Sequence, residues 1–393
     1  MTAPGLRLLV LCHEFPPLAG GGAGAAANVA RELAAQGHEV TVLTSALAGL
    51  PAREESGGAL VVRVSAARRR ADRGGAGHFA AFALAAGLRA PALARARGAQ
   101  AALAFFGLPG GAAALWLRRR CGLPYVLALR GGDVPGQQPG ELARWHRLAG
   151  PALRAVWRGA SAVTANGPGL AARARAFEPG LAVELVPNGV DLERFSPAPA
   201  PGPEAAPDGA TSPLRLLFCG RLAPDKGLET LVPALAALGG APGGWTLTVA
   251  GDGPRRAWLH AALEAAGLAG RARLLGFVPR EAMPGVYRQA DVLVHPSHFE
   301  GQSNVVLEAM ASGLAVVASD IAGCAELVRP GQSGALVPPG DAGALAGALA
   351  GLLARPGLAA AQGRRGRELA VAHGSWARVA RRYAELLAAA SAR

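Results

Sequence analysis

The stretch HPSHFEGQSNVVLEAMASGLAVVAS, residues 295–319, decides the fold of this 393-residue chain. Ser303 is a good N-cap for a helix that begins at Asn304, and Gly313 is typical of a helix end. The β-branched run that follows, residues 314–319, is typical of a buried parallel strand. The stretch therefore predicts a helix followed by a strand, as in a Rossmann-like α/β domain.

Two glutamates stand eight positions apart in this stretch, Glu300 on the loop before the helix and Glu308 inside the helix. Gly301 gives the loop a flexible backbone, and the free N–H groups near Asn304 and Val305 attract phosphate together with the helix dipole. Carboxylates accept hydrogen bonds from sugar hydroxyls. The spacing therefore allows one element to hold phosphate and polyol together. The alternative interpretation of the pair alone is an amphipathic helix with two solvated glutamates.

A strand followed by a basic turn precedes this element in the second half of the chain. Residues 214–227, LRLLFCGRLAPDKG, predict a buried strand that ends in a turn carrying Arg221 and Lys226. Lys226 is the single lysine among 40 Lys and Arg residues, which favours a specific need for an ammonium group at this position. Two cations at a strand-to-helix turn suit a diphosphate.

The chain begins with a similar unit, in which a strand over residues 6–12 precedes a Pro-Gly loop, residues 14–24, and a helix over residues 25–37. Two such starts in one chain indicate two Rossmann-like halves. The loop includes Gly21 and Gly22, but it does not form a G-x-G-x-x-G fingerprint followed by an acidic ribose ligand. This excludes a nicotinamide dinucleotide site here.

Four segments together resemble the GT4 family of retaining GT-B glycosyltransferases. They are the glycine-rich loop, PNGVD at residues 187–191, G-R-L-x-x-x-K-G at residues 220–227, and the E-x7-E signature with its flanking HPS and NVVLEAMASG. The resemblance implies an α/β GT-B fold, in which two Rossmann-like parallel-sheet domains face a cleft. It predicts an N-terminal acceptor-side domain over residues 1–195, a Pro-rich linker over 196–213, a nucleotide-sugar domain over 214–372 and a C-terminal helix over 373–393 that packs back on the first domain.

The same resemblance implies roles for individual residues. Glu300 would lie beside the donor sugar as a catalytic residue, and Glu308 would bind the ribose. The remaining predicted donor-binding residues are Gly21, Gly22, Arg221, Lys226, Phe277, Val278, Gly301, Asn304 and Val305, with Phe277 and Val278 placed near the base.

One turn departs from the family pattern. Where many members have H-G-x-D, this chain has Arg130-Gly131-Gly132-Asp133. Arginine is permanently charged and cannot accept a proton, so an Arg130 that points into the cleft would favour an anionic partner. The alternative is that Arg130 pairs with Asp133 or another local acid and shapes the turn. Arg130 and Asp133 are both predicted as catalytic residues.

The resemblance implies a metal-independent hexosyltransferase that moves a hexosyl group from a nucleotide-diphosphate sugar, with retention, to a lipid-linked or polysaccharide acceptor. No D-x-D motif is present, so a metal-held diphosphate is disfavoured, and no cofactor and no metal site are expected. Two alternatives stay open. One is a nucleotide-sugar 2-epimerase on the same architecture, and the other is a basic binding protein without catalysis.

The net charge of +13 is spread unevenly. Residues 1–190 carry 21 Arg against 10 Asp and Glu, and residues 191–393 carry 19 Lys and Arg against 17 acids. The first half, with runs at Arg68–Arg70 and Arg118–Arg120, is therefore expected to meet anions such as lipid headgroups or an anionic acceptor. Solvated arginine on helix surfaces is the alternative. Nucleic acid is not expected as a partner, because aromatic residues do not alternate with the basic ones.

Cysteine and hydropathy patterns favour a cytoplasmic protein that is either soluble or peripheral on the inner face of the membrane. The four cysteines are far apart and form no C-x-x-C pair, which is typical of buried thiols rather than disulfides or metal ligands. Arg89 interrupts the most apolar stretch, residues 78–97, so no membrane span is expected. Residues 6–12 are too short for a signal sequence.

Overall fold

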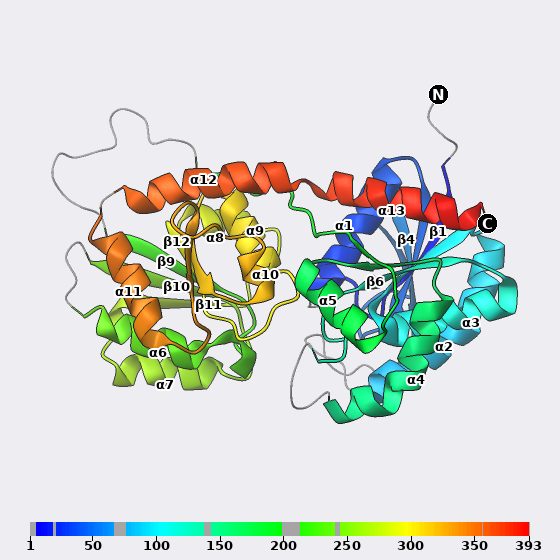
Figure 1. Cartoon of the computed structure of the whole chain (residues 1–393), viewed down its shortest axis with the longest axis horizontal. Coiled ribbons are helices and arrows are strands. Elements are labelled where there is room, and N and C mark those ends of the chain that lie inside the picture. Colours follow the sequence, from blue (N-terminus) through cyan, green and yellow to red (C-terminus); the bar gives the residue numbers. More distant parts are fainter. Residues whose placement is uncertain are drawn as a thin grey trace. The chain divides into compact units, whose positions relative to one another are not determined.

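The computed structural model describes residues 5–18, 21–66, 76–136, 143–198, 213–239, 244–355 and 357–392. The chain forms two compact units, here called unit 1 (Met1–Gly189 with Trp376–Arg393) and unit 2 (Val190–Ser375) (Figure 1). Each contains a predominantly parallel sheet covered by helices, so the predicted α/β class with two Rossmann-like domains is confirmed. Gly20, the run Arg68–Arg70 and most of the predicted linker, residues 199–212, lie outside the described residues.

The sheet of unit 1 has the strand order β3-β4-β2-β1-β5-β6-β7-β8, and only the edge strand β3 is antiparallel to its neighbour among the strand pairs described. The central strand β1 pairs with β2 on one side and β5 on the other, and its Leu8–Leu11 segment is fully buried. The strands are β1 Arg7–Leu11, β2 Glu39–Ser45, β3 Arg53–Ser56, β4 Ala59–Val64, β5 Ala101–Phe105, β6 Tyr125–Leu129, β7 Ala162–Ala165 and β8 Val183–Leu185.

Helices cover both faces of this sheet, as two separate apolar clusters show. Helices α1 and α13 pack on one face, and α2, α3, α4 and α5 pack on the other (Figure 1). The last helix, α13, buries Trp376, Tyr383 and Leu387 in unit 1 beside α1. The helices are α1 Gly21–Ala35, α2 Ala76–Ala96, α3 Gly111–Cys121, α4 Ala143–Gly159, α5 Pro168–Phe177 and α13 Trp376–Ser391.

The sheet of unit 2 is parallel throughout, with the order β11-β10-β9-β12-β13-β14. Helices α6, α7 and α11 pack on one face, and α8, α9, α10 and α12 on the other. The strands are β9 Leu214–Cys219, β10 Trp245–Ala250, β11 Ala272–Gly276, β12 Val292–His295, β13 Ala315–Ser319 and β14 Gly334–Val337. The helices are α6 Leu228–Ala237, α7 Arg256–Ala265, α8 Met283–Arg288, α9 Asn304–Ala311, α10 Ala322–Ala325, α11 Ala342–Leu353 and α12 Leu358–His373.

The first helix begins earlier than its sequence predicts. Gly21 and Gly22 were expected in the loop, because glycine is a poor helix former, but both lie in the first turn of α1. A side chain at Gly22 would place its Cβ 2.2 Å from the ring of Phe106 and 2.8 Å from Glu14. Close packing against Phe106 therefore requires glycine here, and this tertiary contact outweighs the local helix propensity.

The boundary between the units also differs from the predicted one at residue 195. Val190 and Phe195 are buried in the apolar cluster of unit 2, and the ring of Phe195 meets that of Tyr287 edge-on at 5.7 Å. Arg367 of α12 donates to the carbonyl oxygen of Phe195 at 2.7 Å. These contacts hold the end of the PNGVD segment in unit 2, so unit 2 begins at Val190.

Three of the four cysteines are buried and all four are free, as the spacing predicted. Cys121 is the exception to the expected burial, because it lies exposed at the C-terminal end of α3.

Helix α12 approaches the turn after α9 so closely that its glycine leaves no room for a side chain. A Cβ at Gly363 would lie 1.9 Å from the carbonyl oxygen of Gly313. We expect Gly363→Ala to lower the free energy of unfolding by roughly 1–3 kcal/mol through overpacking. The matched control is Gly347→Ala in α11, where a Cβ would meet nothing within 4 Å. It should raise stability by about 0.5–1 kcal/mol. Denaturant titration of both variants tests this, and equal effects would contradict the close approach.

Candidate functional site

The carboxyl ends of β9 and β12 lie at the point where the strand order of the unit 2 sheet reverses. Such switch points are where open α/β sheets bind ligands. The basic turn that follows β9 and the glutamate loop that follows β12 therefore meet at one place. The second loop leads into α9, whose first residue is Asn304. Ser303 caps this helix by accepting a hydrogen bond from the N–H of Val306, as predicted.

Glu300 lies in a small group of charged and polar side chains. Its Oε1 is 2.7 Å from Nζ of Lys226 and 3.1 Å from Nε2 of His295. The glutamate side chain is 18% exposed and the lysine side chain 17%. Burial alone would raise the pKa of Glu300, but Lys226 and His295 outweigh it and hold the pKa below its usual range. Glu300 is therefore a carboxylate at neutral pH.

His295, the last residue of β12, links Glu300 to the start of α9. Its Nε2 also lies 3.3 Å from Oγ of Ser297 and 3.1 Å from Oγ of Ser303, and the residue is 2% exposed. Because Nε2 faces a carboxylate, it carries the proton and donates it. The sequence showed His295 only as part of the flanking HPS and gave it no role. Only the folded structure shows that His295 contacts Glu300.

Lys226 reaches Glu300 because the two loops touch. The residue after it, Gly227, has φ +65°, and a Cβ there would lie 1.9 Å from the carbonyl oxygen of Pro296. Only glycine suits both the left-handed backbone and this approach. The neighbouring Glu300 carboxylate raises the pKa of Lys226, although burial opposes it, so the ammonium is charged.

Arg221 and Lys226 share one acid. Asp225 lies 3.8 Å from the guanidinium of Arg221 and 3.4 Å from the ammonium of Lys226. Arg221 is 44% exposed, whereas Lys226 is nearly buried. The sequence predicted two cations at this turn for a diphosphate. The structure distinguishes an accessible guanidinium from an ammonium that is already paired with Glu300.

Glu308, the second glutamate, has a different environment one turn inside α9. Tyr287, fully buried on α8, donates its hydroxyl to Oε2 of Glu308 at 3.1 Å, and Arg280 lies 3.8 Å from Oε1. Burial raises the pKa of Glu308, although Arg280 and the Tyr287 hydroxyl oppose it. Sequence patterns gave no role to Tyr287, because a buried tyrosine on a short helix is ordinary core material.

The other predicted donor-binding residues of unit 2 lie at the same carboxyl edge. Gly301, Asn304 and Val305 are partly exposed at the start of α9. Phe277, 71% exposed, and the partly exposed Val278 follow the end of β11. The structure thus presents all of these residues at loop or helix ends that solvent reaches.

Asp133 in unit 1 is a structural anchor for its turn. Its carboxylate is buried and accepts backbone N–H groups from Gly107 at 2.7 Å, Arg130 at 3.0 Å and Gly131 at 2.9 Å. Burial raises the pKa of Asp133, and these three donors oppose it. Asp133 therefore supports the turn.

The guanidinium of Arg130 has partners that the sequence did not suggest. It donates to Oδ1 of Asn188 at 2.6 Å and to the hydroxyl of Tyr383 at 3.2 Å, and it lies 4.6 Å above the ring of Phe105. The alternative in which the Arg130 side chain pairs with Asp133 is wrong, because only the backbone N–H of Arg130 meets that carboxylate. The arginine therefore ties the end of β6 to the PNGVD segment and to α13.

Aromatic rings gather at the carboxyl edge of the unit 1 sheet, where the strand order reverses between β1 and β5. His13 follows β1, and its ring lies 4.8 Å from that of Phe106 and 5.0 Å from that of Phe79. Phe106 has φ +68°, an uncommon backbone conformation for a residue with a side chain. It also fills the space above Gly22 of α1. This cluster escaped sequence analysis, since its members come from three separate segments.

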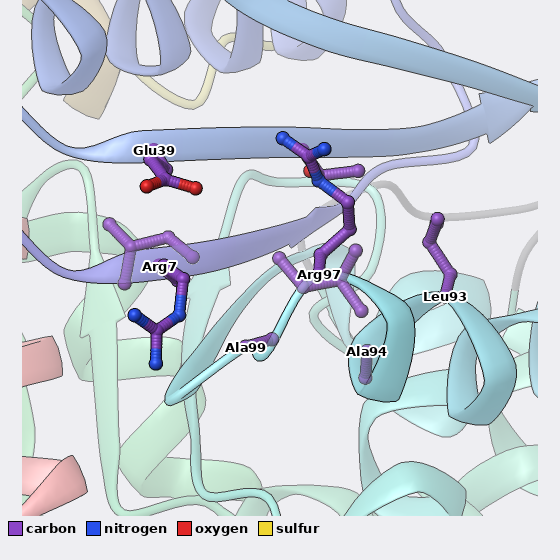
Figure 2. Close-up of a pocket in the computed structure, with 9 residues that line it drawn as sticks. Arg7, Glu39, Leu93, Ala94, Arg97 and Ala99 are labelled. Atoms are coloured by element: carbon purple, nitrogen blue, oxygen red, sulfur yellow. The ribbon is translucent and has the colours of Figure 1, made fainter.

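A pocket at the opposite edge of the same sheet carries no site. It lies beside the amino ends of β1 and β2 and is lined by Arg7, Glu39, Leu93, Ala94, Arg97 and Ala99 among others (Figure 2). Ligands of parallel α/β sheets bind at the carboxyl ends of the strands. Among the residues that the structure describes, no three His, Cys, Asp or Glu side chains come together as a metal site.

Comparisons with known proteins agree with this geometry. Residues 213–355 match the family described as Glycosyl transferases group 1, and residues 19–194 match Glycosyltransferase Family 4. A GDP-mannose-dependent alpha-(1-6)-phosphatidylinositol monomannoside mannosyltransferase of Mycolicibacterium smegmatis is 32% identical over 69% of this chain and 72% of its own. The chain belongs to glycosyltransferase family 4.

Two further proteins, one compared by sequence and one by structure, are similar to this family 4 chain. Glycogen synthase of Mycobacterium tuberculosis is 34% identical over 221 residues, and the match spans half of that enzyme and 54% of this chain. The structure of sucrose-phosphate synthase from Thermosynechococcus elongatus has a TM-score of 0.83 and 26% identity over 97% of this chain and 98% of its own. These relatives are named as transferases and synthases, so the epimerase alternative finds no support among them.

The Lys226–Glu300 contact predicts a pH-dependent contribution to stability. Lys226→Met leaves a buried carboxylate without its cation and should cost about 3 kcal/mol at pH 7. Glu300 has a folded-state pKa below its usual value of 4.5. The stabilisation is therefore fully present above pH 4.5 and declines as the pH falls below it. Denaturant titrations of wild type and variant between pH 7 and pH 3 measure the difference.

A matched control removes an exposed ion pair. Arg365 and Glu368 lie 2.6 Å apart with side chains that are 48% and 64% exposed. Arg365→Met should change stability little at any pH, because solvent screens such a pair. The double variant Lys226→Met/Glu300→Gln should recover part of the loss, since no charge is then left unpaired. A loss for Lys226→Met that does not vary with pH would contradict the coupling.

Proposed function

We propose that this family 4 protein transfers a hexosyl group from a nucleotide-diphosphate sugar to a lipid-linked or polysaccharide acceptor, with retention and without a metal ion. The observation that carries the proposal is the arrangement around the start of α9, where Lys226 lies 2.7 Å from Glu300 and Glu308 stands inside the helix. Cations, carboxylates and backbone donors together match a ligand with both phosphate and hydroxyl groups.

The diphosphate would be held at the basic turn after β9. Arg221 is exposed and offers a forked donor for phosphate oxygens. Lys226 supplies a second charge, for which an incoming phosphate competes with Glu300. The N–H groups near Asn304 and Val305 at the start of α9 favour the same anion. Gly21 and Gly22, at the start of α1 in unit 1, are proposed to contribute to donor binding, and at Gly21 a Cβ would meet nothing within 4 Å.

The nucleoside would lie along the neighbouring loops of unit 2. Glu308, oriented by Tyr287, is proposed to accept hydrogen bonds from the ribose hydroxyls. Phe277 and Val278 follow β11 and would cover the base, and Gly301 leaves its loop open beside the sugar. The relative from Mycolicibacterium smegmatis is named as GDP-mannose-dependent, which supports a nucleotide-sugar donor.

The proposed reaction breaks the bond between the anomeric carbon and the diphosphate oxygen. The electron pair leaves with the diphosphate, where Arg221, Lys226 and the helix N–H groups stabilise the added negative charge. The acceptor hydroxyl attacks on the same face, and its proton passes to the departing diphosphate oxygen. Glu300 stays ionised and balances the positive charge that develops on the sugar ring. Because side chains and helix N–H groups can balance the charge, the proposal needs neither a metal ion nor a cofactor.

Arg130 and Asp133 are proposed to act as positioning residues. Asp133 is buried among backbone donors, and the Arg130 guanidinium is held by Asn188 and Tyr383. Together they shape the loops that carry the acceptor side of unit 1. The +11 charge of residues 1–190 supports an anionic acceptor and a cytoplasmic protein that is peripheral on the inner face of the membrane.

Donor affinity tests the assignment of the site. Lys226→Ala and Glu308→Ala should each weaken binding of the preferred nucleotide-sugar by roughly 1.5–3 kcal/mol, the range for a charged hydrogen bond. Titration calorimetry would follow a thermal-shift screen of UDP-, GDP- and ADP-sugars that identifies the donor. Arg364→Ala, which removes an exposed charge from α12, is the control and should bind normally. Unchanged affinity in both site variants would refute the donor site.

Stereochemistry and metal dependence require a separate measurement. NMR of the product formed from an α-linked donor should show an α-linkage, and saturating EDTA should leave the rate unchanged. An inverted linkage would refute retention, and loss of activity that Mg²⁺ or Mn²⁺ restores would refute metal independence. Glu300→Gln should lower turnover by roughly 100-fold or more, the size of one electrostatic contribution to a transition state. A binding protein without catalysis would form no product with any variant.

A further inference from the structure

Unit 1 exposes three large apolar side chains on α2 and α3. Leu84 is 67% exposed, Leu88 is 72% exposed and Trp116 is 52% exposed. Single exposed leucines are ordinary, but clustered ones indicate an interaction surface. We call Leu84, Leu88 and Trp116, with the arginines that flank them, the α2–α3 patch.

The three side chains form one surface. A Cβ at Gly87 would lie 3.5 Å from the indole ring of Trp116, so the ring rests on α2 at Gly87. Leu88 adjoins Gly87 in the chain, and Leu84 lies one turn before Leu88 on the same side of the helix. The small residue at Gly87 lets the tryptophan of α3 lie against α2 next to Leu88, so the three exposed side chains come from adjoining parts of two packed helices.

Arginines flank the patch, and the chain segment that carries them contains no acid. Residues 76–121 carry six arginines, and no Asp or Glu occurs from residue 73 to residue 132. Arg119 and Arg120 lie about one turn beyond Trp116 on α3, and both are exposed. Arg89 and Arg95 are exposed on α2. The run of arginines at residues 118–120 is visible in the sequence, and the structure places it beside apolar side chains.

Helix α2 is half core and half surface. Its Gly77–Ala96 segment is long and apolar enough to pass as a membrane span by length and composition, despite Arg89, and 39% of that window is buried. Phe82, Ala86 and Ala90 are fully buried against the unit 1 sheet. The helix is therefore part of the core of unit 1, and only its outer side is free to meet a partner.

The chemistry of the patch selects its partner. Exposed Leu and Trp side chains enter the boundary between headgroups and acyl chains, where an indole ring is favoured. Arginines beside them attract anionic headgroups with about 1 kcal/mol each near the surface. A second copy of this chain is a poor partner, because a symmetric contact would bring the uncompensated arginines of both copies together.

We propose that the α2–α3 patch docks unit 1 on the surface of an anionic lipid bilayer. The proposal rests on the proposed function, in which the acceptor is lipid-linked, and it names the surface that meets the lipid. The start of α2 lies at the carboxyl edge of the unit 1 sheet, where His78 contacts the carbonyl oxygen of Ala66 at 2.9 Å and Oγ of Ser45 at 3.4 Å. Docking through the outer side of α2 would bring the bilayer to the edge at which the acceptor is expected.

Sedimentation with vesicles tests the proposal without depending on catalysis. The full chain should bind vesicles of equal parts phosphatidylcholine and phosphatidylglycerol, and it should bind phosphatidylcholine alone much more weakly. Arg119→Gln/Arg120→Gln should reduce the partition coefficient roughly 30-fold, about fivefold for each charge. Leu84→Ser/Leu88→Ser should reduce it roughly tenfold or more through lost apolar burial. Arg118 is left unchanged because its guanidinium donates to the carbonyl oxygen of Gly159.

The matched control removes two exposed arginines from unit 2. Arg364→Gln/Arg365→Gln makes the same change in net charge on α12 and should keep vesicle binding close to that of wild type. Equal losses in both arginine pairs would refute the patch, since general charge would then explain binding. No binding of the wild type to anionic vesicles, or a dimer in sedimentation velocity that Leu84→Ser/Leu88→Ser dissolves, would also refute it. Donor affinity should be normal in all these variants, which separates failure of docking from failure of the proposed function.

Discussion

The contact between Lys226 and Glu300 is the constraint on which the rest of the site in unit 2 depends. A buried carboxylate without a partner is unstable, so the loops that follow β9 and β12 must meet closely enough for a 2.7 Å ion pair. These strands are neighbours in the centre of a parallel sheet, and their carboxyl ends therefore lie side by side. Gly227 removes the last obstacle by letting its backbone lie against Pro296. The pairing of β9 with β12, the glycine at position 227 and the ion pair therefore depend on one another.

The two glutamates of α9 and its preceding loop differ in charge behaviour, although their sequence signature treats them as a pair. Both are largely buried, and burial alone would raise the pKa of each. At Glu300, Lys226 and His295 outweigh burial and lower the pKa, whereas at Glu308 burial prevails over Arg280 and Tyr287. A carboxylate that stays ionised at neutral pH suits a position beside developing positive charge. A carboxyl group that gains a proton more readily suits hydrogen bonding with neutral hydroxyl groups.

Local signals in the sequence predicted what depends on local structure. The Ser303 cap, the strand after Gly313 and the two Rossmann-like starts follow from side-chain chemistry within a few residues, and the structure has all of them. Contacts between distant segments could not be predicted in this way. Arg130 meets partners 58 and 253 positions away, so no local pattern could reveal them.

Two boundaries, the start of α1 and the start of unit 2, also could not be predicted from local sequence. Glycine propensity alone predicts a loop at Gly21 and Gly22, but both lie in α1, and Phe106 occupies the space that a side chain at Gly22 would need. Residues 190–195 join unit 2 because Phe195 packs on Tyr287, a residue that also orients Glu308. The chain segment at the boundary therefore packs against Tyr287, the residue that donates to Glu308. A change at Phe195 would reach the site through Tyr287, although Phe195 itself belongs to the core and binds no ligand in the proposal.

Arginine content alone could not distinguish a functional basic surface from a compositional habit, because this chain uses arginine almost everywhere in place of lysine. Placement makes the distinction. Unit 2 pairs many of its arginines with acids, as at Arg215–Asp291 and Arg256–Asp252. A general bias toward arginine would not change where the acidic residues occur. Asp and Glu are nevertheless missing from the whole segment between residues 73 and 132. In water, arginines without neighbouring acids repel one another, and exposed leucine and tryptophan side chains leave apolar area in contact with solvent. An anionic bilayer can neutralise the charge and bury the apolar area together.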